Sequence, residues 1–456
     1  MERFKRAIEL DGNKATYYNN KALALYHSKL YDESLNEYNR ALNLDPSDAR
    51  TLFNRGNTYL ALERIELAHQ DFDKAIELMP TNAKFYHSKG LAYQSTDEYD
   101  KAIEMFQKAL EVSNDHIPSL YHLGLMEHSS GKLTAALESL TKVLNAIGDD
   151  RLVYEKRGLV YQDIKNYRKA IEDFDKAAEI EPNYSETYYL RGLSKVELGK
   201  FGEGKYEDAI EDFMYALKLL SKNAGIYKGI GEALRLMKDY EKALYYLNMA
   251  LSKEPKNEDF LMERSNIYVD IKQYPKAIED LTNALTRKST DPKILYKRGL
   301  AYYRNKEFKK AIKDLYTSLD NHPFETYEAD IYYHLGISYA NLEMFEKSLP
   351  PLSKAIDLAY NQPTYIHERA KSHLLTDQYS KALEDYSQVI KLQPKNSHAY
   401  FGRAFAFKAL KRYEDAAEDF EKAKELDPFN PKLIINPKKI YEIKYVKLCE
   451  PGEEEK

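Results

Sequence analysis

Residues 52–80 read LFNRGNTYLALERIELAHQDFDKAIELMP, and this stretch contains the pattern that decides the fold. A small residue recurs at the place of Gly56 through the whole chain, in most copies 34 residues apart. A fixed period of this length is typical of a repeat array rather than of a single globular domain. A position that is always small also predicts that two backbones approach closely there. The series consists of Ala22, Gly56, Gly90, Gly124, Gly158, Gly192, Gly231, Ser265, Gly299, Gly336, Ala370 and Ala404.

Further positions follow the small residue at fixed distances within each copy. In the quoted stretch, Ala68 comes twelve residues after Gly56, Phe72 four residues later and Ala75 three residues after that. Spacings of three and four place these side chains on one face of a helix. Pro80 closes the stretch, and proline does not continue a helical hydrogen-bond ladder. Each copy therefore predicts a helix, a tight turn, a second helix and a proline-marked turn.

This order of residues resembles the signature of the tetratricopeptide repeat family, which runs aromatic or Leu, Gly, Tyr, Ala, aromatic, Ala and Pro. The resemblance covers roughly residues 1–430 in twelve copies, of which the fourth and tenth are degenerate. It implies an all-α fold, a right-handed superhelical solenoid of about 12 tetratricopeptide repeats. In such an array each unit buries its apolar face on its neighbours.

The domain organisation follows from the positions of the copies. We expect a half-repeat with only a second helix over residues 1–14, twelve repeats over 15–430, a capping helix over 431–449 and an acidic tail over 450–456. Solenoids need caps on their exposed apolar ends. The half-repeat is completed by a partner, belongs to a longer chain or is a frayed end, and the sequence leaves these three alternatives open.

Three places depart from the repeat pattern. A five-residue insertion at 200–204 is expected to enlarge the surface turn between two helices of one repeat, and a short insertion near 326–328 is expected to lengthen a turn between two repeats. Pro350 and Pro351 fall where the second helix of the tenth repeat is expected. They should distort or restart that helix, which makes them a candidate kink or hinge.

Composition excludes several classes of function. The formal net charge of −5 and the pI near 6.2 provide no basic field for nucleic acid. The single cysteine, Cys449, excludes an intramolecular disulfide, and no run approaches the roughly eighteen apolar residues of a membrane-spanning helix. We expect a soluble cytoplasmic protein that binds no membrane.

No catalytic or metal-binding motif stands out in the chain. The eleven histidines form no motif with metal-ligand spacing, and the recurring glycines are packing residues rather than a phosphate-binding loop. The sequence therefore predicts no enzymatic activity and no cofactor.

A basic residue precedes the small position in nine copies, and eight of the nine have an acid sixteen residues later once the insertion is discounted. Three copies have Leu123, Ile230 or Leu335 in place of the base, and these copies lack the acid as well. Lys89 is the exception, because Met105 stands sixteen residues later where an acid is expected. Charges that disappear together predict an ion pair between the two helices of one repeat, since pairing with the preceding repeat fits less well. Half-exposed pairs contribute ~0.2–1 kcal/mol each, so we expect them to fix geometry. The pairs are Lys21–Glu37, Arg55–Asp71, Arg157–Asp173, Arg191–Asp212, Arg264–Asp280, Arg298–Asp314, Arg369–Asp385 and Arg403–Asp419.

The family resemblance implies that the first helices line a concave groove, with the fifth position of each repeat facing outward. An aromatic, apolar lining is typical of surfaces that bind a peptide or helix. The ninth-position leucines either share that role or pack between neighbouring helices. The predicted groove residues are Phe53, His87, Tyr121, Tyr189, Lys228, Tyr296, Tyr333, His367 and Phe401.

The resemblance also raises the carboxylate clamp by which co-chaperones of this family hold a C-terminal carboxylate. Lys228, Lys293 and Lys297 match positions of that clamp, but Glu232 and Glu263 stand where the clamp has asparagines. Their charges oppose a carboxylate ligand. The sequence therefore predicts a non-enzymatic scaffold or adaptor that binds peptide or helical segments of other proteins, several at once. A structural subunit of a large cytoskeletal or ciliary assembly is the open alternative.

Overall fold

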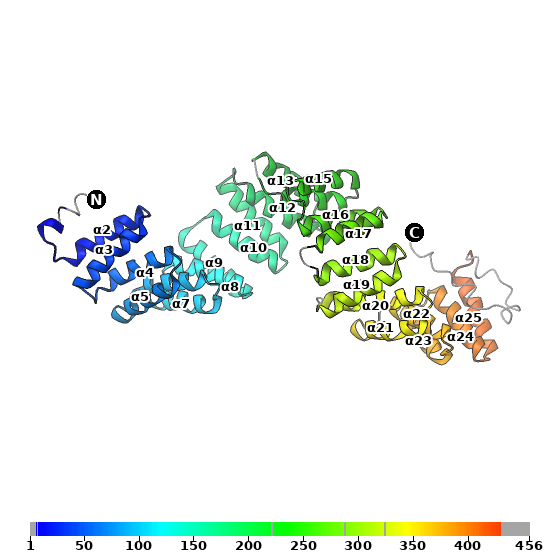
Figure 1. Cartoon of the computed structure of the whole chain (residues 1–456). Coiled ribbons are helices and arrows are strands. Elements are labelled where there is room, and N and C mark those ends of the chain that lie inside the picture. The colour runs from blue at the N-terminus through cyan, green and yellow to red at the C-terminus, as the bar shows by residue number, and fades with distance from the viewer. Residues whose placement is uncertain (1–5, 7, 220–221, 287–288, 323–324, 430–456) are drawn as a thin grey trace. The chain divides into compact units, whose positions relative to one another are not determined.

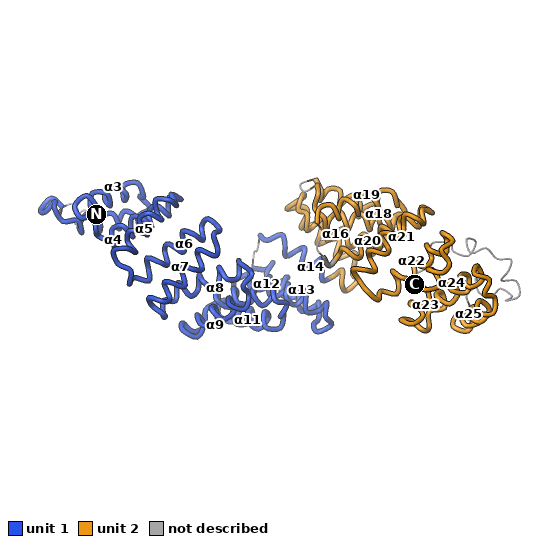
Figure 2. Tube along the Cα trace, turned by 90° about the horizontal axis from the view of Figure 1, so that it is seen from below, with its two compact units in different colours: residues 1–233 blue, residues 234–456 orange. Residues whose placement is uncertain are grey.

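The computed structural model describes residues 6, 8–219, 222–286, 289–322 and 325–429. Every secondary-structure element in that part of the chain is a helix. Consecutive helices pack against each other in pairs along the chain (Figure 1). The chain divides into two compact units, residues 1–233 and 234–456, and the division falls within α14 (Gly225–Leu236) (Figure 2). This confirms the predicted all-α fold of stacked helix pairs.

In the first unit, each even-numbered helix is the first of a pair and each odd-numbered helix the second. First helices pack on the second helix of their own pair and on that of the preceding pair. The helices are α2 (Ala15–His27), α3 (Tyr31–Leu44), α4 (Ala49–Ala61), α5 (Ile65–Leu78), α6 (Ala83–Gln94), α7 (Tyr99–Val112), α8 (Ile117–Ser129), α9 (Leu133–Ile147), α10 (Arg151–Asp163), α11 (Tyr167–Ile180), α12 (Ser185–Lys200) and α13 (Tyr206–Lys218).

The second unit continues the same alternation. Its helices are α15 (Tyr240–Lys253), α16 (Glu258–Asp270), α17 (Tyr274–Ala284), α18 (Pro292–Arg304), α19 (Phe308–Asp320), α20 (Glu325–Asn341), α21 (Phe345–Leu358), α22 (Pro363–Leu375), α23 (Tyr379–Leu392), α24 (Ser397–Ala409) and α25 (Tyr413–Leu426).

The recurring small residue allows the second helix to press its largest side chain against the first. A β-carbon on Gly56 would lie 2.7 Å from a ring carbon of Phe72, and one on Gly90 would lie 2.6 Å from Phe106. These distances are shorter than van der Waals contact, so the position cannot accept a side chain without displacement of the ring. Both rings are fully buried, and they form the core of each pair.

The insertion at 200–204 lengthens the first helix and also enlarges the turn that follows it, as predicted, whereas the insertion near 326–328 lengthens a first helix, which corrects the prediction that it enlarges a turn between two repeats. Helix α12 has 16 residues and runs through Lys200, whereas α10 has 13, and the turn after α12 covers residues 201–205, whereas the turn after α10 covers only residues 164–166. Glu197, Leu198 and Lys200 favour helix, while Gly202 has a φ of 75°, a conformation that ends it. Helix α20 has 17 residues and begins at Glu325, so residues 326–328 are helical as well.

Pro350 and Pro351 lie inside α21, which is one uninterrupted helix from Phe345 to Leu358. The prediction that they restart the helix is therefore wrong. The buried face of α21 holds it in place: a β-carbon on Gly336 of α20 would lie 2.4 Å from Leu352 Cγ, so the two helices are in very close contact. A moving hinge at these prolines stays a prediction.

The half-repeat predicted for residues 1–14 lies only partly within the described residues. The capping helix predicted for 431–449 and the acidic tail predicted for 450–456 lie outside them. Among the helices that the structure does describe, none combines the length and the hydrophobicity needed to cross a membrane.

Candidate functional site

The eight base–acid pairs singled out from the sequence are in contact in the structure. Arg55 donates from Nε and Nη2 to the two carboxylate oxygens of Asp71, each at 2.7 Å. Such a two-point contact fixes orientation as well as distance. The same arrangement joins Arg157–Asp173, Arg191–Asp212, Arg264–Asp280, Arg298–Asp314, Arg369–Asp385 and Arg403–Asp419, and Lys21 donates to Glu37 at 2.8 Å.

These bases make a further contact that the sequence reasoning missed. Arg55 also donates from Nη1 to Asn39, on the second helix of the preceding repeat, at 2.7 Å. Lys89, which has Met105 rather than an acid sixteen residues later, pairs with Asp73 in the same way. The sequence does contain a sign of this contact, because the residue sixteen positions before each of these bases is polar. The other contacts of this kind are Arg157–Thr141, Arg191–Asp175, Arg264–Asn248, Arg298–Thr282, Arg369–Ser353 and Arg403–Ser387.

The predicted groove aromatics lie mainly against other aromatic rings. The ring of Phe53 is 6.1 Å from Phe72 of the same repeat and 4.8 Å from Phe85 of the next. Tyr296 and Phe401 are buried, with 8% and 7% of their surface exposed. These side chains therefore contribute to packing, and their contact with a ligand stays a prediction. Ring contacts also join His87–Phe106, Tyr189–Phe213, Tyr333–Tyr365, His367–Tyr386 and Phe401–Phe420, while Tyr121 packs on the core cluster around Leu140.

A pocket of about 300 Å³ opens between successive first helices of the first unit. Helices α10, α12 and α14 supply most of its lining, and α11 supplies one tyrosine. Leu193 and Val196 form its apolar part. Its full lining consists of Gln162, Tyr167, Leu193, Val196, Glu197, Lys228 and Glu232. The pocket combines an apolar floor with groups of both charges.

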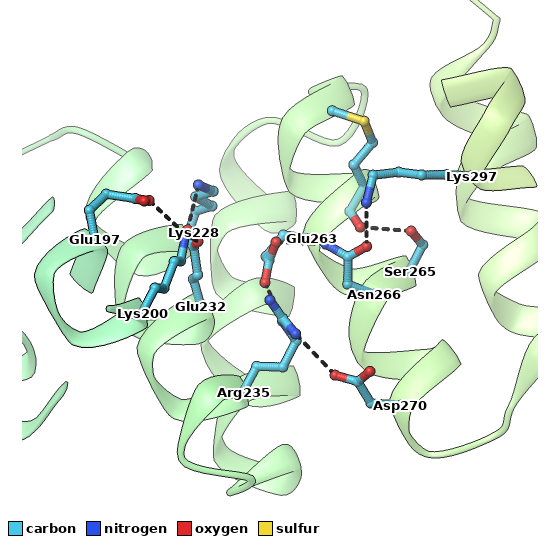
Figure 3. Close-up of polar contacts among 11 residues, drawn as sticks. Glu197, Lys200, Lys228, Glu232, Arg235, Glu263, Ser265, Asn266, Asp270 and Lys297 are labelled. Atoms are coloured by element: carbon cyan, nitrogen blue, oxygen red, sulfur yellow. Dashed lines mark hydrogen bonds and ion pairs between the residues drawn. The ribbon is translucent and has the colours of Figure 1, made fainter. Parts of the chain in front are cut away.

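Glu232 is the centre of charge in this pocket. It is buried and accepts from Lys228 at 2.8 Å and from Lys200 at 2.7 Å (Figure 3). Burial opposes ionisation of Glu232, but the two ammonium groups outweigh it and lower its pKa to about 2. Lys200 also donates to Glu197 at 2.6 Å. The cluster is thus two cations and two anions that neutralise one another.

The second unit contains its own polar network. Arg235 contacts Glu263 at 2.7 Å and Asp270 at 3.1 Å, and Asn266 donates to Glu263 at 2.9 Å and accepts from Lys297 at 2.8 Å (Figure 3). Burial lowers the pKa of Lys297, although Glu263 opposes this shift. Glu263 is therefore held in place where a carboxylate clamp has an asparagine.

Three histidines meet in the first unit, where the sequence reasoning found no cluster because they are distant in the chain. The ring of His87 lies 5.3 Å from the rings of both His116 and His122. Burial lowers the pKa of all three, and that of His87 to about 4. Among the described residues, no group of three or more His, Cys, Asp or Glu side chains is placed to hold a metal ion.

Comparison with family models identifies the repeats directly. Models described as "TPR repeat" match residues 28–63 and 266–306. Models described as "Tetratricopeptide repeat" match residues 49–82, 83–116, 152–184, 198–258, 294–324 and 367–431. The matches together cover most of the chain.

Two curated relatives match over part of their length. The small glutamine-rich tetratricopeptide repeat-containing protein 2 of Saccharomyces cerevisiae is 31% identical over 103 residues, which are 23% of this chain and 26% of that protein. The BBSome complex member BBS4 homolog of Drosophila melanogaster is 21% identical over 288 residues, which are 54% of this chain and 59% of that protein. The chain thus spans between a quarter and three fifths of these relatives.

Solved structures with a similar fold include a tetratricopeptide repeat protein from Parabacteroides merdae. It is 20% identical with a TM-score of 0.49, and the match covers 56% of this chain and 98% of that one. Yeast Tom70 is 16% identical with a TM-score of 0.39 over 90% of this chain and 92% of that one.

Proposed function

Because this chain belongs to the tetratricopeptide repeat family, whose members generally mediate protein–protein interaction, we propose that it is a non-enzymatic scaffold. It binds peptide or helical segments of partner proteins on the surface formed by its first helices. Each repeat contributes its first helix to this surface, so the surface lengthens with every repeat that is added.

The contacts between successive first helices are the observation on which this proposal rests. Gln162 of α10 donates to Ser194 of α12 at 2.7 Å, and Lys200 of α12 donates to Glu232 of α14 at 2.7 Å. Such contacts join neighbouring repeats on the side where the 300 Å³ pocket opens. They support a pre-formed surface that offers polar and apolar groups to an extended segment or a helix.

Affinity on such a surface is spread over many positions. Each repeat offers its own side chains, so one partner can occupy several repeats and two partners can occupy different ones. Linked contacts raise the overall affinity without a new strong site.

A pair of matched substitutions tests which face binds. Leu152 on first helix α10 is 46% exposed, and Leu67 on second helix α5 is 40% exposed. Neither change removes a buried side chain, so both variants should fold. Cross-linking mass spectrometry on cells expressing each variant should show partners lost with Leu152→Glu and kept with Leu67→Glu. Partners that survive Leu152→Glu but are lost with Leu67→Glu would move the binding face to the second helices.

The similarity to a BBSome complex member favours a second candidate, a structural subunit of a large cytoskeletal or ciliary assembly. The location would then be the cytoskeleton or cilium rather than the general cytoplasm. Size-exclusion chromatography of cell extract separates the two. A subunit elutes with a large complex in fixed stoichiometry, whereas an adaptor shows a substantial pool at the size of the single chain.

A co-chaperone that clamps a C-terminal carboxylate is the least favoured function. Glu232 is paired with Lys228 and Lys200, and Glu263 is paired with Arg235. Both acids lie beside the lysines that would have to receive the ligand, and a carboxylate ligand would meet their like charge.

A further inference from the structure

A carboxylate without a cationic partner lies on the first helices of the second unit. Asp330 of α20 is half-buried and accepts a hydrogen bond from the hydroxyl group of Tyr365 on α22. Burial and the charge of Asp330 raise the pKa of Tyr296 on α18, so a second tyrosine lies beside this carboxylate. Three successive first helices therefore meet at Asp330, and both of these neighbours are neutral.

Within the part of the chain that the structure describes, Asp330 forms no ion pair. Acids on other first helices do, and the pairs are Glu155–Arg151 at 2.6 Å, Glu232–Lys228 at 2.8 Å and Glu263–Arg235 at 2.7 Å. Glu127 of α8 also lacks an ion pair with a described residue, but it is buried, whereas Asp330 is partly exposed. A half-buried carboxylate that lacks a countercharge favours a cationic ligand, because the ligand would compensate for its lost hydration.

Aromatic rings lie next to this carboxylate, and their burial fixes them in place. Tyr296 and Tyr365 are only 8% and 9% exposed. The ring of Tyr365 stacks on that of Tyr333 at 4.5 Å, and the ring of Tyr296 lies 5.4 Å from that of Tyr327. The faces of such rings attract cations, arginine more often than lysine. An acid with tyrosine rings beside it is therefore suited to a guanidinium group.

The chain itself contains the same combination with an arginine in place. Arg298 donates to both carboxylate oxygens of Asp314, and its guanidinium carbon lies 5.8 Å from the centre of the Tyr302 ring. Equivalent sets are Arg55 with Asp71 and Tyr59, and Arg264 with Asp280 and Tyr268. The tenth repeat has Leu335 and Pro351 where this arginine and aspartate would stand. At Asp330 the same repeat offers an acid and tyrosines, and no arginine of the described residues pairs with that acid.

We propose that Asp330 and its tyrosines bind the side chain of an arginine in a partner's segment and so hold that segment on α18, α20 and α22. The guanidinium group would donate to Asp330 and lie against the tyrosine rings. This proposal rests on the proposed function, because it assumes that the first-helix surface receives such segments.

One exposed cation of the chain lies close enough to oppose this ligand. Arg304 is the last residue of α18, and burial together with the charge of Arg304 lowers the pKa of His334 on α20. Because Arg304 does not pair with Asp330 in the described structure, its charge would repel an incoming guanidinium. Removal of that charge should therefore strengthen binding, a result that a purely structural role of Asp330 does not predict.

Selection of peptides on the full chain tests the assignment. A phage-displayed library of random peptides is depleted on Asp330→Asn and then selected on the purified wild-type chain, and a selection without depletion runs in parallel. Asparagine keeps an oxygen that can accept from Tyr365, so this variant removes the charge but not the acceptor. Asp259→Asn is the matched control, because Asp259 is exposed and also stands six residues before the small position of its repeat. Circular dichroism establishes that each variant is folded, and Arg304→Gln, which changes only an exposed side chain, supplies an independent test.

Peptides from the depleted selection should share an arginine. In fluorescence polarisation, replacement of that arginine by glutamine, or of Asp330 by asparagine, should weaken binding about tenfold. Asp259→Asn should leave the affinity unchanged, and Arg304→Gln should raise it about threefold.

A depleted selection that yields no peptide, or peptides that share no arginine, would overturn the inference, and so would a lower affinity with Arg304→Gln. Peptides from the selection without depletion would in that case still support the proposed function. A wild-type chain that enriches no peptide even without depletion would contradict both.

Discussion

Arg191 donates from Nη1 to Asp175 at 2.6 Å, across the boundary between two repeats. The same guanidinium holds Asp212 of its own repeat through Nε and Nη2. One side chain therefore connects α11, α12 and α13. Because equivalent contacts recur along the chain, the angle between neighbouring repeats is determined by hydrogen-bonding geometry as well as by apolar packing.

The two acids around Arg191 should differ in their effect on stability. Asp212 is buried, and its replacement by alanine leaves the guanidinium without its main partner, which should lower the free energy of unfolding by about 3 kcal/mol. Asp175 is half-exposed, so Asp175→Ala should cost only about 0.5 kcal/mol. Urea unfolding, with hydrogen exchange to locate the change, measures both. Equal effects would show that the contact across the repeat boundary matters as much as the pair within the repeat.

Gly56→Ala should destabilise the first unit by about 1–3 kcal/mol, because the new methyl group would lie 2.7 Å from the buried ring of Phe72. Gly204→Ala is the control. Its methyl group would meet its nearest neighbour at 3.5 Å, an ordinary contact, and the change should be close to neutral. Thermal unfolding followed by circular dichroism compares the two, and a neutral Gly56→Ala would mean that the ring moves aside at little cost.

Glu63→Gly should stabilise the chain by about 0.5–1 kcal/mol. Glu63 has a φ of 58° in the tight turn between α4 and α5, a conformation that costs an L-residue energy and a glycine almost none. Arg64→Gly, at a neighbouring residue with a φ of −90°, should instead destabilise. Urea midpoints of the two variants should move in opposite directions, and a common loss of stability would argue against a strained turn.

The first unit should lose stability as the pH falls from about 6.5 to 4, because His87 is neutral when folded, with a pKa of about 4, and takes up a proton more readily when unfolded. The charges of His116 and His122 oppose protonation of His87 and so lower its pKa. Lys84 lowers the pKa of His116, whereas Asp115 raises it.

His87→Phe isolates this effect. Phenylalanine occupies the equivalent position in the preceding repeat as Phe53, so the contact with Phe106 should survive while the titrating group is removed. The unfolding midpoint of this variant should fall less between pH 7 and pH 5 than that of the wild type. An unchanged pH dependence would assign the acid sensitivity to other groups.

Much of the fold could be predicted from the sequence because the determinants are local and recur. Gly56, Ala68 and Phe72 mark two helices and the face on which they meet, and the joint loss of base and acid in three copies pointed to pairs such as Arg55–Asp71, which are in contact. The insertions were harder to place. Glu197, Leu198 and Lys200 favour helix, but the pattern of a single copy does not say how the inserted residues divide between α12 and the turn that follows.

The sequence by itself therefore determined the repeat, its two helices and the residues that hold each pair together, since each of these depends on spacings within about 34 residues. The contacts between copies depend on tertiary structure, although a polar residue sixteen positions before each base is a sign of one set of them in the sequence. The reach of Arg191 to Asp175, the meeting of His87, His116 and His122, and the pocket at Glu232 all depend on how far one repeat is rotated against the next. That rotation results from side-chain packing over the whole interface, and no single motif encodes it.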